Sequence, residues 1–150
     1  MTRFIPLVLF ILLVVGGGSL IGATNTPGEW YAALEKPPFN PPNWIFAPVW
    51  TTLYVMIAVA GWRIWRQART GGAMTAWWLQ MGLNFLWSPV FFTLQSVGLA
   101  LAVIVALLAA IVAFIVLAWD RDRPAALLFL PYAAWVGFAT LLNASIFWLN

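Results

Sequence analysis

Residues 97–119 read VGLALAVIVALLAAIVAFIVLAW, a stretch that contains no charged or amide side chain. A helix of roughly 20 apolar residues is long enough to cross the hydrocarbon core of a bilayer. The charged tetrapeptide Asp120-Arg121-Asp122-Arg123 follows directly, where such a helix would leave the membrane. This stretch therefore predicts a transmembrane helix.

Four further apolar segments flank this one, at residues 4–23, 44–65, 73–94 and 124–149. The sequence is 64% hydrophobic and only 7% charged, whereas soluble domains carry about 25% charged residues. We expect one all-α domain over residues 1–150, an integral membrane bundle of five transmembrane helices. A secretory signal peptide is the alternative interpretation of residues 4–23, but the run exceeds the usual length and no A-x-A site follows.

Residues 24–43 form the one long polar segment between the apolar runs. This segment contains Pro37, Pro38, Pro41 and Pro42, which oppose helix formation and favour an extended course. Long loops in compact domains often act as lids or binding loops. We therefore expect this first loop to act as a lid over a ligand cavity.

Basic residues are distributed unequally between the two ends of the predicted bundle. Lys36 lies at one end, and six arginines lie at the other: Arg3, Arg63, Arg66, Arg69, Arg121 and Arg123. Loops rich in Lys and Arg remain in the cytoplasm, so the N-terminus is expected inside and the long loop outside. Helical spans favour the bacterial inner membrane, because outer-membrane proteins are typically barrels.

Polar side chains recur at four-residue spacing within the predicted spans. Gln80, Asn84 and Ser88 share one helix face, and Asn143 lies one turn after Ala139. An amide in hydrocarbon needs a hydrogen-bond partner or a cavity. Two compatible interpretations stay open for the asparagines: they bond between helices, or they line a cavity beneath the loop.

The sequence contains 11 tryptophans, too many for interfacial belts alone. We expect interfacial anchoring for those near span ends, namely Trp44, Trp62, Trp65, Trp119 and Trp148. Trp50, Trp87 and Trp135 lie deeper or on the polar stripes, and for them we expect pocket lining. Such an aromatic, uncharged pocket suits a planar apolar ligand.

Several kinds of chemistry are excluded by residues that the sequence lacks. It has no Cys and no His, which excludes disulfides, thiolate metal sites and histidine acid–base catalysis. No ionisable side chain lies deep in a predicted span, which argues against proton relays and ion-coupled transport. We expect no metal site, no hydrolytic nucleophile–base pair and no nucleic-acid partner.

Ordered aromatic and proline motifs run through the whole chain. They are Trp30-Tyr31, Lys36-Pro37-Pro38, Pro41-Pro42-x-Trp44, Val49-Trp50-Thr51-x-Leu53-Tyr54, Leu83-Asn84-x-x-Trp87 and Pro131-Tyr132-x-x-Trp135-x-x-Phe138-Ala139-x-x-Leu142-Asn143. In combination and order they resemble the tryptophan-rich sensory protein family, also called the translocator protein or peripheral-type benzodiazepine receptor family.

The resemblance implies a cavity that binds porphyrins, haem and benzodiazepine-site ligands, with no required cofactor. Its lining, carried over by position, would be Tyr31, Pro41, Trp50, Tyr54, Asn84, Trp87, Trp135, Ala139 and Asn143. Trp30 would belong to the lid. The family also implies a homodimer and a role in tetrapyrrole-linked or stress-linked sensing, regulation or transport. Because some members are placed in the outer membrane, the resemblance leaves that location open beside the inner membrane.

The resemblance leaves two further functions open besides a tetrapyrrole sensor, regulator or carrier. One is an enzyme that degrades porphyrin in light, with Trp50 and Trp135 as the reactive indoles. The other is a structural or partner-binding membrane protein whose pocket holds lipid. Cholesterol recognition is not expected, because residues 142–150 lack the Tyr and Lys or Arg of the proposed sterol motif.

Overall fold

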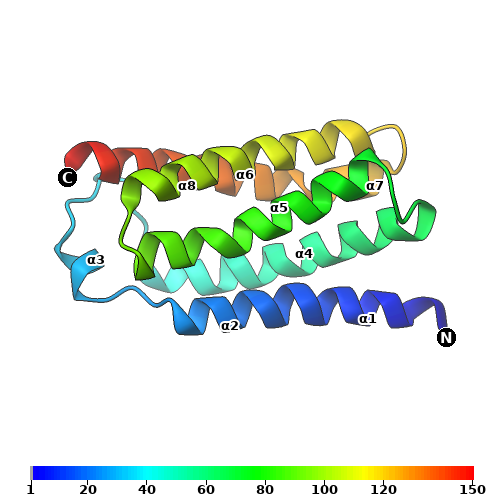
Figure 1. Ribbon diagram of the computed structural model, residues 1–150, viewed down its shortest axis with the longest axis horizontal. Helices are drawn as coiled ribbons and strands as arrows, with labels where there is room; N and C mark the ends of the chain where they lie inside the picture. The colour runs from blue at the N-terminus through cyan, green and yellow to red at the C-terminus, as the bar shows by residue number, and fades with distance from the viewer. Residues whose placement is uncertain (1) are drawn as a thin grey trace.

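The computed structural model describes residues 2–150, which are helical throughout apart from short connections, with no strand among them. Long helices lie side by side as a bundle, with the N-terminus at one end and helix α3 at the other (Figure 1). The first rod runs through η1 (Thr2–Phe4), α1 (Ile5–Ile11), the π-helical turn η2 (Leu12–Gly16) and α2 (Gly17–Thr24). It packs mainly against α4 through its first half.

The remaining rods follow the predicted spans closely. They are η3 (Asn43–Ile45) with α4 (Phe46–Gln67), α5 (Gly72–Ser88) with the π-helical turn η4 (Pro89–Thr93), α6 (Val97–Ala118), and α7 (Arg123–Leu128) with α8 (Leu130–Leu149). Helix α6 packs against both α5 and α8. Its start is capped by Ser96, whose hydroxyl accepts a hydrogen bond from the Leu99 amide.

Prolines lie where two of the rods, α5 with η4 and α7 with α8, change course. Pro131 has no amide hydrogen and crowds the carbonyl four residues earlier, so a helix cannot pass through it undisturbed. The break falls at Phe129, between α7 and α8. Pro89 likewise coincides with the change from α5 to η4, where the Leu94 amide bonds to the Pro89 carbonyl. Pro48 lies in the first turn of α4, where proline is tolerated.

Within residues 2–150, four helices are long and apolar enough to cross a membrane: Thr2–Thr24, Asn43–Gln67, Val97–Ala118 and Arg123–Leu149. The third expected span, 73–94, is helical as α5 and η4 but falls outside this set. Its hydropathy is lowered by Gln80 and Asn84, both of which are buried against other helices. The polar stripe is therefore turned away from the outer surface of the bundle.

The first loop is less extended than predicted, because residues Glu29–Ala33 form the short helix α3. This helix precedes the four prolines, and Leu34 then turns to extended backbone. Lys36 Nζ caps the end of α3 by donating to the carbonyls of Tyr31, at 2.7 Å, and Leu34, at 3.1 Å. The prolines thus exclude helix only from their own stretch.

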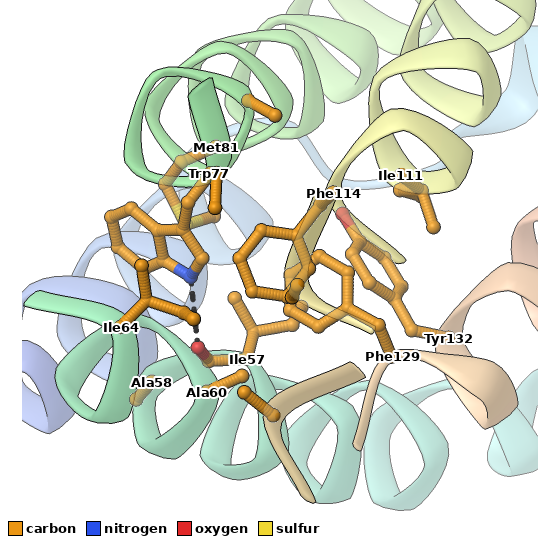
Figure 2. Close-up of a cluster of buried hydrophobic side chains, with 14 of the residues drawn as sticks. Ile57, Ala58, Ala60, Ile64, Trp77, Met81, Ile111, Phe114, Phe129 and Tyr132 are labelled. Atoms are coloured by element: carbon orange, nitrogen blue, oxygen red, sulfur yellow. Dashed lines mark hydrogen bonds between the residues drawn. The ribbon is translucent and has the colours of Figure 1, made fainter. Parts of the chain in front are cut away.

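The apolar core is densest toward the end of the bundle that holds the N-terminus. Figure 2 shows Trp77 against Ile57 and Ile64, with Phe114 and Phe129 beside them. The indole nitrogen of Trp77 donates to the Ile57 carbonyl at 2.9 Å. The predicted interfacial position of Trp62 is wrong: it is only 7% exposed and belongs to this core. Trp44 and Trp148, in contrast, are largely exposed.

The arginine-rich loops converge at this same end. The Arg63 guanidinium makes two nitrogen contacts to the Asp122 carboxylate, with Nε–Oδ2 at 3.0 Å and Nη2–Oδ1 at 3.1 Å. Gln67 Nε2 donates to the same carboxylate at 2.8 Å. Asp122 is buried, so this cluster fastens the turn before α7 to the end of α4.

Candidate functional site

A cavity of about 470 Å³ lies between the helices at the end that carries the first loop. Its wall is formed by α2, the loop with α3, α4, α5 with η4, α6 and α8. Every rod of the bundle therefore contributes to one chamber. Ligand pockets typically measure about 300–1,000 Å³, so the size is suitable for an organic ligand.

Eight of the nine residues expected to line a cavity lie on this wall: Tyr31, Trp50, Tyr54, Asn84, Trp87, Trp135, Ala139 and Asn143. They come from α3, α4, α5 and α8, which are far apart in the chain. The aromatic rings contact one another as they enclose the space. The Trp50 and Tyr54 rings are 5.5 Å apart, and Phe46 lies 5.8 Å from Trp135.

Pro41 departs from this expectation, since it is not among the residues that line the cavity. The neighbouring Asn40 faces the chamber instead, and successive side chains of an extended segment point in opposite directions. Trp30 is also off the wall. Its ring packs edge-on against Phe91, a wall residue, at 5.8 Å, so it covers the chamber from outside.

Asn84 belongs to a hydrogen-bond network that reaches from the cavity into the core. Its Nδ2 donates to the Tyr132 hydroxyl at 2.7 Å, and that hydroxyl donates to Gln80 Oε1 at 2.8 Å. The Tyr54 hydroxyl donates to Asn84 Oδ1 at 3.5 Å. Asn84 therefore both joins helices and lines the cavity, so the two interpretations of this amide hold together.

Asn143 plays the same double role on α8. Its Oδ1 accepts from the Trp87 indole nitrogen at 3.0 Å, and its Nδ2 donates to the Val97 carbonyl at 3.0 Å. These bonds tie α8 to α5 and to the start of α6. They also fix the plane of the Trp87 ring, which stacks on Phe91 at 4.9 Å.

Sequence reasoning did not foresee the contribution of α2 and α6 to the wall. Gly18 and Gly22 of α2 and Ile104 and Leu107 of α6 line the chamber. A Cβ on Gly18 would lie 2.3 Å from the Tyr54 ring, so only glycine allows this approach. The four-residue spacing of Gly18 and Gly22 was a sequence signal for the part of the wall in α2. The aliphatic residues of α6 gave no signal that distinguishes wall residues from their neighbours.

The wall carries no charged side chain among the described residues, yet it has unpartnered polar atoms. The indole nitrogen of Trp135 and Oδ1 of Asn40 are buried without a hydrogen-bond partner in residues 2–150. In the lid, burial raises the pKa of Tyr31, an effect that Asn40 partly offsets. The phenol is therefore neutral at physiological pH and available as a hydrogen-bond donor.

The loop is attached to the bundle at two places. At the middle of the loop, the Asn150 side chain bonds both backbone groups of Glu35: Oδ1 accepts from the amide at 3.1 Å and Nδ2 donates to the carbonyl at 2.9 Å. At its start, the Thr93 hydroxyl donates to Asn25 Oδ1. Between these points, Tyr31 packs edge-on against Phe92. The loop thus covers the chamber as a fastened lid.

Comparison with known proteins agrees with these features. Residues 9–149 match the model of the TspO/MBR family. The chain is 38% identical to a tryptophan-rich protein TspO of Archaeoglobus fulgidus, covering 99% of this chain and 97% of the relative. It is 42% identical to the translocator protein of Bos taurus, over 93% of this chain and 87% of the relative. It is 36% identical to a tryptophan-rich sensory protein of Cereibacter sphaeroides, over 96% of this chain and 91% of the relative. The chain is therefore an integral membrane protein that belongs to the TspO/MBR family.

Proposed function

We propose that the cavity binds a porphyrin or related tetrapyrrole, and that the protein acts as a sensor, regulator or carrier in tetrapyrrole metabolism and stress response. One observation carries this proposal: Trp50, Trp87 and Trp135 converge on a single uncharged chamber. Indole rings offer large flat apolar surfaces on which a planar macrocycle stacks. The names of two relatives, a sensory protein and a translocator protein, accord with sensing or transport.

The polar atoms of the wall suit the edge of such a ligand. Wall residues Trp135 and Asn40 each hold a buried polar atom with no partner among residues 2–150. A rotation of the side chain would let the Trp135 nitrogen donate to a ligand acceptor and the Asn40 oxygen accept from a ligand donor. Synthetic benzodiazepine-site ligands, which are also aromatic, fit the same description. Porphyrin or haem enters this proposal as a ligand, with no cofactor required.

In the membrane, we take α5 with η4 as the fifth span, because it lies among the other rods and buries its amides inward. The gathering of arginines at the N-terminal end supports an orientation with the N-terminus inside. The lid then faces the outside of the bacterial inner membrane. A homodimer belongs to the same proposal, whereas the missing sterol motif argues against specific cholesterol binding.

The direct test is a titration of the purified protein with protoporphyrin IX, followed by tryptophan fluorescence. Saturable quenching at micromolar ligand is expected, since three indoles line the site. Trp135→Leu removes one stacking surface and should weaken binding. Trp148→Leu should not weaken binding, because the Trp148 side chain is 86% exposed and lies off the cavity wall. Quenching that never saturates, and that free tryptophan in the same detergent reproduces, would leave the lipid-filled pocket of a structural protein as the better account.

A second function, light-dependent porphyrin breakdown, is favoured by the placement of two indoles. Trp50 and Trp135 both lie on the wall, and the Trp50 ring is 6.4 Å from that of the buried Tyr132. Indoles and phenols are the oxidisable side chains available there. Trp50→Phe and Trp135→Phe should each slow porphyrin loss under light; equal rates in both variants and the unaltered protein would exclude these indoles as reactants.

A further inference from the structure

A second cleft lies between the N-terminal segment and the end of α4. Figure 1 shows these two segments at the end of the bundle opposite α3. The cleft measures about 340 Å³ and is lined by Thr2, Arg3, Pro6, Trp65, Arg66 and Arg69. Three guanidinium groups from two separate segments of the chain therefore border one small space. The proposed tetrapyrrole function makes no use of this cleft.

The three arginines of the cleft differ from Arg63 and Arg123 in having no acidic partner. Within residues 2–150 the ion pairs are Arg63–Asp122 and Arg123–Asp120, and neither involves the cleft. The chain has only two other acidic residues, Glu29 and Glu35, and both belong to the first loop at the far end of the bundle. The positive charge of the cleft is thus unbalanced by this chain.

Aromatic rings hold these guanidinium groups in place. Arg66 lies over the Trp62 ring at 4.6 Å, Arg69 over Trp65 at 4.4 Å, and Arg3 over Phe4 at 4.8 Å. Stacking occupies the face of a guanidinium and leaves its N–H edge open to an acceptor. None of these edges donates to another described residue.

An apolar stripe leads from the cleft along the outside of the first rod. Leu9 and Leu13, three and seven residues after Pro6, continue its helix face and are 59% and 41% exposed. A headgroup in the cleft would therefore leave room for an acyl chain alongside these leucines. This continuity of charge and apolar surface matches an anionic phospholipid.

From this arrangement we infer that the cleft binds the phosphate headgroup of an anionic phospholipid, through Arg3, Arg66 and Arg69. Arginine recognises phosphate oxygens with paired N–H donors, and basic pockets at the cytoplasmic ends of helices hold anionic headgroups. In the orientation proposed above, the cleft faces the cytoplasmic leaflet. Free inorganic phosphate shares the same chemistry and must be distinguished by experiment.

The test is a native mass spectrometry titration of the detergent-purified protein with phosphatidylglycerol, and with zwitterionic phosphatidylcholine as the comparison lipid. We expect saturable binding of phosphatidylglycerol and much weaker binding of phosphatidylcholine. The double variant Arg66→Gln/Arg69→Gln should weaken phosphatidylglycerol binding about twenty-five-fold, at about fivefold for each arginine. Inorganic phosphate at millimolar concentration forms a separate arm, read as a thermal shift; stabilisation by phosphate without retention of lipid would assign the site to the free ion.

The matched control is Arg121→Gln/Arg123→Gln, which removes the same charge from the same end but outside the cleft. Equal losses in the two double variants would mean that net charge alone attracts the lipid, and the proposed site would be wrong. Equal binding of the two lipids, or no binding of either lipid or phosphate, would also overturn it. Porphyrin titration of each variant checks folding independently, because the proposed tetrapyrrole cavity shares no residue with the cleft. If the double variant fails to fold, Arg3→Gln provides the same test.

Discussion

Both ends of the bundle are rich in tryptophan, but the rings fill a core at one end and border a cavity at the other. At the arginine end, Trp77 is fully buried and lies against Gly61, where an added Cβ would meet its ring at 2.4 Å. At the loop end, Trp50 lies beside Tyr54, and both rings border a chamber. The interlocking side chains around Trp77 fill space at close to the density of a crystal, whereas the rings at the loop end border a cavity of about 470 Å³.

Under the proposed function, this difference assigns stability mainly to the arginine end and ligand binding to the loop end. The arginine end is additionally fastened by the ion pair between Arg63 and the buried Asp122, and the loop end is held by amide hydrogen bonds from Asn84 and Asn143. A filled core resists change in volume, but a wall beside a cavity has room to adjust. Mutations of matched residues at the two ends should therefore have different consequences.

The largest contrast is expected between Trp77→Ala and Trp50→Ala. Removing the Trp77 ring empties a closed core and breaks its bond to the Ile57 carbonyl, which should destabilise the protein by about 3–5 kcal/mol. Removing the Trp50 ring enlarges an existing cavity, so the loss of stability should be less than half as large. Unfolding in mixed detergent micelles measures both changes.

Porphyrin affinity should show the reverse order for the same pair of tryptophan variants. Trp50→Ala removes a stacking surface of the chamber, whereas Trp77 does not line it. The fluorescence titration is therefore run at a temperature where both variants are folded. Equal loss of stability in the two variants would refute the division between a filled end and a hollow one.

A smaller contrast is expected between Gly61→Ala and Gly18→Ala. Each new methyl group would meet an aromatic ring, Trp77 at 2.4 Å and Tyr54 at 2.3 Å. The Trp77 ring is locked in the core, so Gly61→Ala should cost about 1–3 kcal/mol through overpacking. Tyr54 borders the chamber and has space to turn into it, so Gly18→Ala should cost less.

The displaced Tyr54 ring would occupy ligand space, and porphyrin binding to Gly18→Ala should weaken about tenfold or more, the effect of one misplaced methylene group in a pocket. Gly82→Ala is the control, because no atom lies within 4 Å of its added Cβ and alanine favours helix. Gly18→Ala with full affinity would show that Tyr54 yields in another direction.

The helices were predictable because an isolated apolar segment in a bilayer can satisfy its backbone hydrogen bonds only by forming a helix. Their ends fall within a few residues of the predicted ones, as for Val97–Ala118. The helix α3 was missed because its five residues carry no apolar period. Trp62 was misplaced because its position near a span end says nothing of the direction in which the ring turns.

The aromatic and amide part of the cavity wall was similarly visible in the sequence. Asn84 and Asn143 recur with aromatic residues at helical spacing, and a buried amide needs partners. The aliphatic side of the wall, at Ile104 and Leu107, was not visible, because all of α6 is equally apolar. Which of its faces turns inward depends on packing against α5 and α8.

The smallest effect, and the one that tests the lid, is expected for Asn150→Ala. This change removes the two bonds between the Asn150 side chain and the Glu35 backbone. Both bonds are exposed, so their loss should cost about 1 kcal/mol or less. Loosening the lid lets ligand enter and leave more often without altering the chamber wall, so association and dissociation should both accelerate by about threefold to fivefold.

The equilibrium affinity of Asn150→Ala should therefore stay within about twofold of the original value, and stopped-flow fluorescence with protoporphyrin IX resolves the two rates. Ser145→Ala is the matched control, since it removes a hydroxyl bond within α8, to the Leu141 carbonyl at 2.8 Å, without touching the loop. Unchanged rates in Asn150→Ala would show that ligand enters by another route, between the helices, and that the fastening at Glu35 only orders the loop.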